Sequence, residues 1–379
     1  MSKLTESDLE LLRDTAARFF DDQLPVDALR RLRDEADDIG FNRVIWREMA
    51  EMGWAGILID ERHGGIDPGH TAMGSILEQA GRTLAASPLI STAVISAPII
   101  AHSADSTEHG GVLARMAAGD CILALAHEEG SRHAPHCIAT RAEKHGKTYL
   151  INGRKTFVLD GHAADHLIVV TRTDGGDNDR DGLTLFLVDA TASGIRRTRT
   201  NMVDARNSAN IEFEKVTVTA NAVIGTPGSG LEILEPVLDG ARAGLAAEML
   251  GTGQEAFDRT LEYLKVREQF GAPIGSFQAL KHRAAEMYCE IELTRSATYG
   301  ALAAIDAKDG ETAALASAAK AKACDMLELV SNEAIQMHGG IGMTDEADIG
   351  LFLKRARVTQ QILGDAIFHR DRYATLIGI

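Results

Sequence analysis

The spacing of hydrophobic residues divides the chain into three stretches with different periods. From residue 6 to about residue 118, apolar residues recur at the three- and four-residue spacing of an amphipathic helix. Glycine-rich and proline-rich points such as Gly64-Gly65 and Pro68-Gly69 interrupt this pattern. The first stretch is therefore predicted to be helical.

Near Cys121 the period changes to one typical of β-strands. Short runs rich in β-branched and aromatic residues alternate with turn residues, and Asn152-Gly153 predicts a tight turn. The strand-like runs cover residues 149–159, 167–170, 183–188 and 211–218. We expect a β-domain of barrel or sandwich type.

Long helical patterns return after Gly228-Ser229-Gly230 and continue to the end of the chain. Three or four such helices predict a four-helix-bundle domain. The fold class is therefore α+β. The predicted domains are an N-terminal helical domain over residues 1–120, a middle β-domain over residues 121–226 and a C-terminal helical bundle over residues 227–379.

One turn between two of these helices carries candidate chemistry. The helical pattern ends before Gly271 and Pro273 and begins again at Gln278, which predicts a helical hairpin with an irregular turn. Arg267, Phe270 and Gln278 would gather there as a cation, an aromatic face and an amide. Such a set could bind a phosphate and a planar ring. Alternatively, Arg267 pairs with a surface carboxylate, Phe270 lies in the core and Gln278 caps a helix.

A second turn follows the last long helical pattern, at Gln336-Met337-His338-Gly339-Gly340. Glycines allow a ligand to approach the backbone closely. They serve equally well to end a helix. The residues alone leave both interpretations open.

Composition narrows the class of protein. The chain has 379 residues, with 45% hydrophobic and 25% charged residues, and 39 Lys+Arg against 55 Asp+Glu give a net charge of −16. This length predicts two or three domains, and the acidic charge argues against a nucleic-acid partner.

The cysteines and the apolar stretches indicate the cellular compartment in which the protein is expected. The four cysteines are scattered, so we expect four buried thiols in a reducing compartment and no metal site. The N-terminus lacks the apolar core of a signal peptide, and the apolar stretch 88–101 is too short to span a bilayer. We therefore expect a cytoplasmic protein without a membrane span.

Several blocks of sequence together resemble the acyl-CoA dehydrogenase family of flavoproteins, over nearly the whole chain. The most specific blocks are Arg267-Glu268-Gln269-Phe270-Gly271 with Phe277-Gln278, and Gln336 with Gly339-Gly340. Supporting matches are residues 151–155, residues 213–218 and Ile224-Gly225.

This resemblance implies a cofactor and a reaction. The residues implied to contact the pyrophosphate and adenine half of an FAD bound in the neighbouring subunit are Arg267, Phe270, Gln278, Gln336, Gly339 and Gly340. The implied reaction removes the α-hydrogen of an acyl-CoA thioester as a proton and the β-hydrogen as a hydride to flavin N5. It needs a carboxylate base at the α-carbon, and an electron-transfer flavoprotein is the implied electron acceptor.

The carboxylate base is missing from both positions that the family uses. Near the C-terminus, Leu363 precedes Gly364 where the family places a glutamate, and on the first bundle helix Ala241 precedes Arg242 at the alternative position. No catalytic residue can be assigned. Asp365 stands where the family has a threonine and is the candidate for a displaced base.

Further departures lie on the side of the flavin ring. The family's ring-binding loop corresponds to residues 126–131, and its Trp-Ile-Thr strand corresponds to residues 157–159. Both have lost hydrogen-bonding threonines, although Ser131 could remain as a contact. The half-site for a neighbour's FAD is thus intact, and the half-site for the chain's own flavin ring is altered.

This asymmetry resembles the base-less subunit of bacterial heteromeric acyl-CoA dehydrogenases. The leading hypothesis is therefore a subunit of an FAD-dependent acyl-CoA dehydrogenase, completed in a heterotetramer by a related base-bearing chain. One alternative is a self-sufficient homodimer or homotetramer that uses a displaced base such as Asp365. Another is a non-catalytic scaffold or binding protein that retains the fold.

Overall fold

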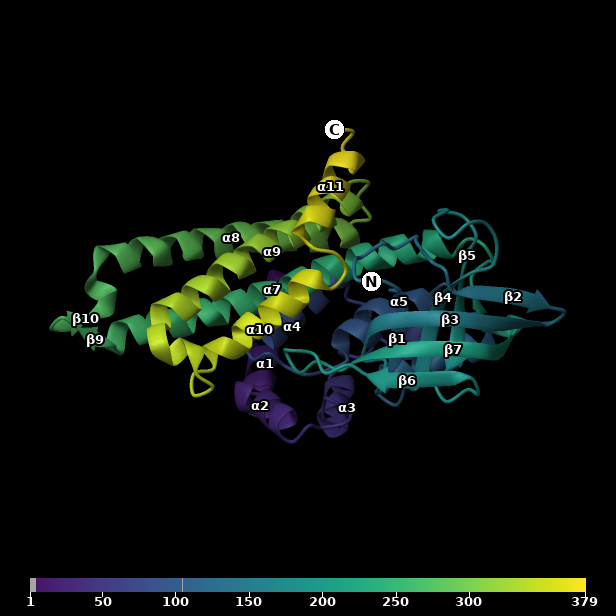
Figure 1. Cartoon of the computed structure of the whole chain (residues 1–379), viewed down its shortest axis with the longest axis horizontal. Helices are drawn as coiled ribbons and strands as arrows, with labels where there is room; N and C mark the ends of the chain where they lie inside the picture. Colours follow the sequence, from purple (N-terminus) through teal and green to yellow (C-terminus); the bar gives the residue numbers. More distant parts are fainter. Residues whose placement is uncertain (1–4, 104) are drawn as a thin grey trace. The chain divides into compact units, whose positions relative to one another are not determined.

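The computed structural model describes residues 5–103 and 105–379, which form two compact units (Figure 1). One unit comprises Met1–Arg31, His70–Ala85 and Arg242–Ile379, and the other comprises Leu32–Gly69 and Ala86–Ala241. We call them the bundle unit and the sheet unit and describe each separately. Helices α2 (Val26–Asp34) and α7 (Gly230–Val266) run from one unit into the other.

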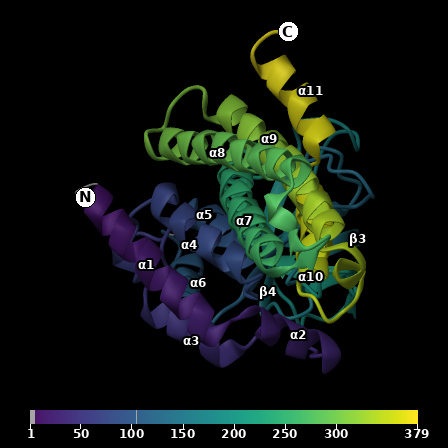
Figure 2. The same cartoon turned by 90° about the vertical axis from the view of Figure 1, so that its left-hand side faces the viewer.

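The described residues of the bundle unit form helices, their connecting turns and one short hairpin. Figure 2 shows its long helices nearly end-on, with α8 and α9 side by side. Besides the end of α7, its helices are α1 (Glu6–Gln23), α4 (His70–Arg82), α8 (Gln278–Asp306), α9 (Thr312–His338), α10 (Ile349–Gln361) and α11 (Ala366–Leu376), with a 3-10 turn η5 (Gly339–Met343). The predicted helical bundle is confirmed.

The turn between α7 and α8 is a small hairpin. Strands β9 (Glu268–Gln269) and β10 (Ala272–Pro273) pair antiparallel, and a 3-10 turn η4 (Ile274–Ser276) leads into α8. Phe270 and Gly271 between the strands have φ of 55° and 79°. Positive φ at both central residues is the geometry of the two-residue hairpin turn that matches strand twist. The predicted irregular helical hairpin is confirmed.

The sheet unit combines one sheet with short helices. Its helical segments are α3 (Arg43–Glu51), η1 (Glu61–His63), the π-helix η2 (Leu89–Ser96), α5 (Ala97–Ala101), α6 (Thr107–Ala117) and η3 (Ala220–Ala222). Its strands are β1 (Leu123–Ala126), β2 (Arg141–His145), β3 (Thr148–Leu159), β4 (His166–Arg172), β5 (Leu183–Asp189), β6 (Ile195–Arg199), β7 (Ser208–Thr219) and β8 (Val223–Ile224).

These strands form a mixed sheet in the order β6-β7-β3-β2-β4-β5-β8, and β1 pairs with β4 in parallel (Figure 1). Alternate residues of β7 are buried, as expected for a strand with one face on the core. Tyr149 and Phe186 meet edge-on in this core, with ring centroids 4.9 Å apart. The predicted β-domain is confirmed.

The prediction of a tight turn at Asn152-Gly153 was wrong. Both residues lie inside β3, where the register with β7 shifts between Ile151 and Gly153. Gly153 has φ +151°, and a Cβ there would lie 2.4 Å from Thr140 Oγ1. Asn152 Oδ1 accepts from the Lys215 backbone N–H at 2.8 Å. The Asn-Gly pair therefore lies at a β-bulge, where glycine permits a backbone conformation that other residues rarely adopt.

The structure bears on two expectations from the sequence, the burial of the four thiols and the absence of a membrane span. Cys121 and Cys324 are buried, whereas Cys137 is half-buried and Cys289 is exposed. The expectation of four buried thiols was therefore wrong for two of them. Among the described residues, no helix is long and apolar enough to cross a membrane.

Two glycines set the distance between α4 and α7 in the bundle unit. A Cβ on Gly251 would lie 1.8 Å from the Glu78 carbonyl oxygen, and a Cβ on Gly81 would lie 2.0 Å from the Glu248 carbonyl oxygen. Thr252 Oγ1 also donates to the Gly81 carbonyl at 3.2 Å. The two backbones touch, so any side chain at either glycine would push the helices apart.

We predict that Gly251→Ala lowers the free energy of unfolding by about 3 kcal/mol or more, because backbone rather than a flexible side chain must move. The matched control is Gly300→Ala in α8, where a Cβ would meet nothing within 4 Å. It should raise stability by about 0.5–1 kcal/mol through helix propensity. Thermal or urea unfolding measures both. Equal midpoints for the two variants would contradict the contact.

Candidate functional site

The Arg267 turn presents an unpaired cation at one end of the bundle unit. The Arg267 backbone is fixed, since its N–H donates to the Tyr263 carbonyl at 2.9 Å and its carbonyl accepts from Ile274 N–H at 2.8 Å. Its side chain is exposed and has no ion-pair partner among the described residues. The expectation that Arg267 pairs with a surface carboxylate of its own chain is thus not supported.

Phe270 lies at the tip of this turn and is 93% exposed, so the interpretation that it belongs to the core was wrong. Its ring meets the edge of Phe277, with centroids 6.1 Å apart. Gln278 is the first residue of α8, and its side chain is exposed. All three side chains therefore face outward from the bundle unit.

The second predicted turn ends α9. Gln336 and Gly340 are exposed, and Gly339 has φ 63° and ψ −138°, a conformation that favours glycine. A Cβ on either glycine would meet nothing within 4 Å. The space in front of this backbone is open, so these glycines leave room for a ligand rather than for a packed neighbour.

An aromatic stack joins the two turns. Tyr263, in the last turn of α7, stacks on His338 at the end of α9, with ring centroids 4.5 Å apart and planes 19° apart. Both rings line a hollow of about 350 Å³ together with Val266 and Ile341. The structure thus brings the two sequence motifs to the same end of the bundle unit.

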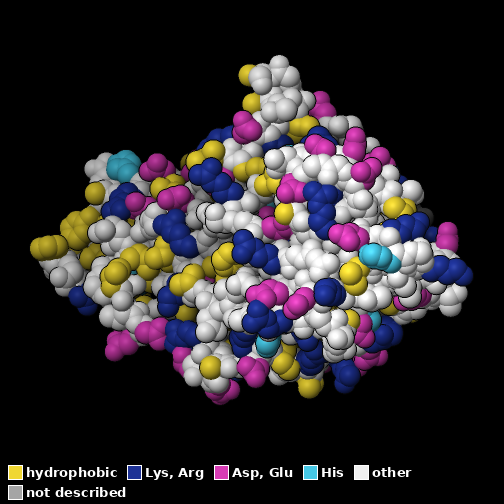
Figure 3. Space-filling view, turned by 45° about the vertical axis from the view of Figure 1, so that its right-hand side comes forward, with side chains coloured by type: hydrophobic (Ala, Val, Ile, Leu, Met, Phe, Trp, Pro, Cys, Tyr) yellow, Lys and Arg dark blue, Asp and Glu magenta, His cyan; other side chains and the backbone are white. Residues whose placement is uncertain are grey.

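Exposed apolar side chains surround these turns. Figure 3 shows hydrophobic side chains gathered at its left-hand end, where Figure 1 places β9 and β10. The exposed apolar residues of the two turns are Val266, Phe270, Phe277, Ile341 and Met343. An apolar surface around an unpaired cation is typical of a site that a partner or ligand covers.

At the C-terminal base position, Leu363 adopts a positive φ of 60°. Its carbonyl accepts from Arg242 Nε at 3.4 Å and from His369 Nε2 at 3.0 Å. At the alternative position, Ala241 is fully buried. Neither residue can take a proton, so the structure agrees with the absence of a carboxylate from both positions.

A buried lysine donates hydrogen bonds to the main chain on either side of Leu363. Lys320 is fully buried, and its Nζ donates to the carbonyls of Gly364 at 2.9 Å and Gln360 at 3.3 Å and lies 3.3 Å from Cys324 Sγ. Burial lowers the pKa of Lys320. Backbone carbonyls, rather than a carboxylate, solvate this ammonium group.

Asp365 has a structural role. It is the N-cap of α11, and its Oδ1 accepts from the Phe368 backbone N–H at 2.8 Å. Side-chain oxygens at this position satisfy one of the unpaired donors of a helix start. The carboxylate proposed as a displaced base is therefore directed at the helix end.

In the sheet unit, the loop after β1 is fixed by a buried ion pair. Lys155 on β3 is fully buried, and its Nζ donates to Glu129 Oε1 at 2.7 Å and to the His127 carbonyl at 3.0 Å. Burial lowers the pKa of Lys155 to about 8, although Glu129 opposes this shift. Glu129 also accepts from the backbone N–H groups of Ala139 and Thr140.

The altered Trp-Ile-Thr segment lies beside this loop. The Thr156 backbone N–H donates to the Glu128 carbonyl at 2.7 Å. Phe157, which follows, has φ 49° and is about half exposed, at a second irregularity in the register of β3 and β7. Ser131 is exposed on the loop. The two segments that differ from the family pattern are thus neighbours.

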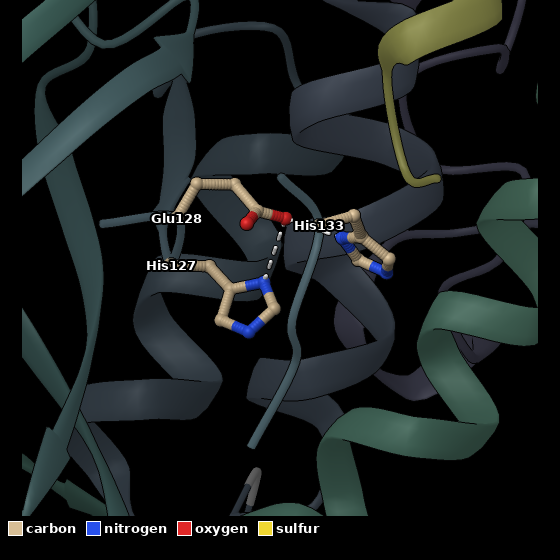
Figure 4. Close-up of side chains that lie close together, drawn as sticks. All are labelled: His127, Glu128 and His133. Carbon is tan, nitrogen blue, oxygen red and sulfur yellow. Dashed lines mark hydrogen bonds and ion pairs between the residues drawn. The ribbon is translucent and has the colours of Figure 1, made fainter. Parts of the chain in front are cut away.

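The sequence did not predict one cluster in this loop. His127 and His133 are turned toward the Glu128 carboxylate (Figure 4). Glu128 Oε1 lies 2.5 Å from His133 Nδ1 and 3.6 Å from His127 Nδ1. In the sequence, the available signal was the short spacing of the two histidines and the glutamate along the chain. Only the fold shows that the loop brings residue 133 back beside residue 128.

The electrostatics of the cluster follow from its burial. His127 is 3% exposed, and burial lowers its pKa to about 4. Burial opposes ionisation of Glu128, yet the neighbouring His127 and His133 hold the pKa of Glu128 at about 2. The cluster therefore holds a carboxylate and a neutral His127 imidazole at neutral pH.

The residues of the two half-sites differ in how well they suit an FAD. The Arg267 turn offers a free guanidinium, an exposed ring and open glycine backbone, which suit a pyrophosphate and an adenine. The loop after β1 presents an ionised carboxylate and imidazoles where the family has hydroxyl donors. The nucleotide half fits the cofactor, and the ring half has changed its chemistry.

Comparison with known proteins identifies the family. The acyl-CoA dehydrogenase N-terminal, middle and C-terminal domain models match residues 6–120, 123–216 and 228–375. The chain therefore belongs to the acyl-CoA dehydrogenase family. Its three-part architecture is that of this family, whose members are FAD-binding oxidoreductases, as the sequence predicted.

Individual relatives span almost the whole chain. Cyclohex-1-ene-1-carbonyl-CoA dehydrogenase of Geobacter metallireducens is 30% identical, covering 96% of each chain. The 3-(aryl)acrylate reductase of Clostridium sporogenes is 29% identical, over 92% of this chain and 93% of that protein. Among solved structures, a variant of the Tcur3481-Tcur3483 steroid acyl-CoA dehydrogenase is 31% identical, with a TM-score of 0.87 and 98% of each chain covered.

We predict that Asp365 matters for stability as a helix cap. Asp365→Ala should lower the stability of the bundle unit by about 1 kcal/mol, because the first turn of α11 loses its acceptor. Asp365→Asn should change it by only a few tenths of a kcal/mol, since Asn caps as well as Asp. Thermal unfolding and hydrogen exchange of α11 report the difference. An equal loss in both variants would contradict the capping role.

Proposed function

We propose that this chain is the base-less subunit of an FAD-dependent acyl-CoA dehydrogenase, which a related base-bearing subunit completes. The observation that carries this proposal is the combination of an open, unpaired Arg267 turn with Leu363 and Ala241 at the base positions. The chain retains the means to hold a nucleotide and lacks the carboxylate that would abstract the α-proton.

The chain's own contribution is to bind and orient. Arg267 would donate to the pyrophosphate, Phe270 would stack on a planar ring, and the backbone at Gly339 and Gly340 would approach the nucleotide closely. Gln278 and Gln336 supply amide groups at the same end of the bundle unit. When bound, FAD supplies the hydride-accepting chemistry of the reaction.

A second, related subunit is supported by the nature of the exposed surface. Phe270 and Met343 are 93% and 79% exposed, and such apolar surface around a charged site is usually covered in an assembly. The solved relative at 31% identity is named for two gene products. In a heterotetramer, the Arg267 turn of this chain would complete the FAD site of a base-bearing chain.

We also propose the class of substrate, the electron acceptor and the limits of the three domains. The substrate class is an acyl-CoA thioester, in keeping with the cyclohex-1-ene-1-carbonyl-CoA dehydrogenase relative, and an electron-transfer flavoprotein would take the electrons. We retain residues 1–120, 121–226 and 227–379 as the domains. A self-sufficient homo-oligomer would require Asp365 to leave its position as the cap of α11.

We predict that the chain purified alone binds little FAD and does not oxidise acyl-CoA thioesters. Co-expression with a related chain that carries a base should give a complex with the absorbance of bound flavin and measurable turnover. Full flavin occupancy and turnover by the lone chain would overturn the proposal, and loss of that turnover in Asp365→Asn would favour the homo-oligomer. Absence of flavin from every assembly would favour the scaffold hypothesis.

We predict that Arg267→Ala weakens FAD binding by the complex about 10- to 100-fold, the loss expected for a charge-assisted hydrogen bond. The matched control is Lys265→Ala, which lies two residues before Arg267 and removes an exposed charge that pairs with Glu262. Equilibrium dialysis with absorbance detection measures both. If the two variants lose the same affinity, the effect is one of general charge rather than contact by Arg267.

A further inference from the structure

The loop after β1 holds three side chains in the arrangement of a metal-binding site. No metal centre was expected from the sequence, because that expectation rested on the spacing of the cysteines alone. In the described part of the chain, the candidate ligand atoms of His127, Glu128 and His133 all lie within 4.8 Å of one another. The ligand atoms around one tetrahedral zinc ion lie about 3.3 Å from one another. Small side-chain movements would therefore bring all three onto one ion.

The orientation of His127 is already fixed for ligation. Its Nε2 lies 3.0 Å from the Pro135 carbonyl, so this nitrogen carries the proton and donates it. The lone pair is then on Nδ1, the atom that faces Glu128 in Figure 4. Ligating histidines in proteins commonly donate their other ring N–H to such a carbonyl, which fixes tautomer and direction.

The surroundings of the cluster also suit a cation. Glu128 places its carboxylate between the two imidazoles. The nearby Lys155 ammonium would oppose a cation, but Glu129 neutralises it at 2.7 Å. The Glu128 side chain is 26% exposed, whereas that of His133 is 3% exposed, so an ion has a path to a largely enclosed site.

We propose that His127, Glu128 and His133 form a binding site for a divalent transition-metal ion of the zinc type. Two imidazoles and one carboxylate are a ligand set that zinc uses in proteins, and three protein ligands leave a fourth position for water. The site lies within the sheet unit, in the loop that differs from the family pattern. It does not depend on the flavin or on a partner subunit.

The test measures metal binding by the full-length chain after treatment with a chelator. Titration with Zn²⁺ against a chromophoric chelator should give one tight site per chain, and Co²⁺ should give the intense visible absorption of a four-coordinate complex. His133→Ala and Glu128→Gln should each weaken binding at least about 100-fold, beyond the effect of losing an outer-shell partner. Circular dichroism verifies that each variant is folded.

The matched control is the exposed pair Glu143 and His145 on β2, where His145 Nε2 lies 3.8 Å from Glu143 Oε2. The double variant Glu143→Gln, His145→Asn should retain full Zn²⁺ affinity. If His133→Ala does not fold, His127→Asn provides the same comparison. Unchanged stoichiometry and affinity in the cluster variants, or no tight site in the unmodified chain, would overturn the proposal and leave Glu128 and His133 as an ion pair.

Discussion

Buried cations that donate to backbone carbonyls hold the irregular segments of this protein in place. Lys320 binds the carbonyls of Gln360 and Gly364, and Lys155 binds that of His127. The half-buried Arg197 likewise donates to three carbonyls of the turn between β3 and β4. Loops carry backbone acceptors that no ladder satisfies, and an unsatisfied buried polar group is costly. Long cationic side chains supply the missing donors from neighbouring regular elements.

This mode of support makes the turn at Leu363 independent of the side chain at that position. The turn at Leu363 is held through its main chain, by Arg242, His369 and Lys320, and none of these contacts uses the side chain of residue 363. Exchange of a carboxylate for an isobutyl group there removes no hydrogen bond that fixes the turn. The side chain at position 363 can therefore change without loss of the hydrogen bonds that hold the turn.

The sequence predicted those features that depend on local chemistry. The spacing of hydrophobic residues and the positions of glycine and proline were enough to predict the helical bundle, the strands of the sheet and the hairpin between α7 and α8. They failed at Asn152-Gly153, because glycine is favoured both in tight turns and in β-bulges and only the pairing of β3 with β7 distinguishes the two. Phe270 was open to two interpretations, since a sequence does not show whether an aromatic residue at a turn points inward. The His127 cluster required a loop to fold back on itself, which no periodicity encodes.

The loop after β1 also bears on whether this chain is merely a scaffold. A lysine that is fully buried must have its charge compensated by an ion pair or by hydrogen bonds, since an uncompensated buried charge is strongly destabilising. The loop meets this need through Glu129 and the His127 carbonyl, and it sets Glu128 between two imidazoles a few ångströms away. Glu129 and the His127 carbonyl already compensate Lys155, so this support uses neither the Glu128 carboxylate nor the two imidazoles. The loop therefore carries an ionic cluster beyond the one that Lys155 requires.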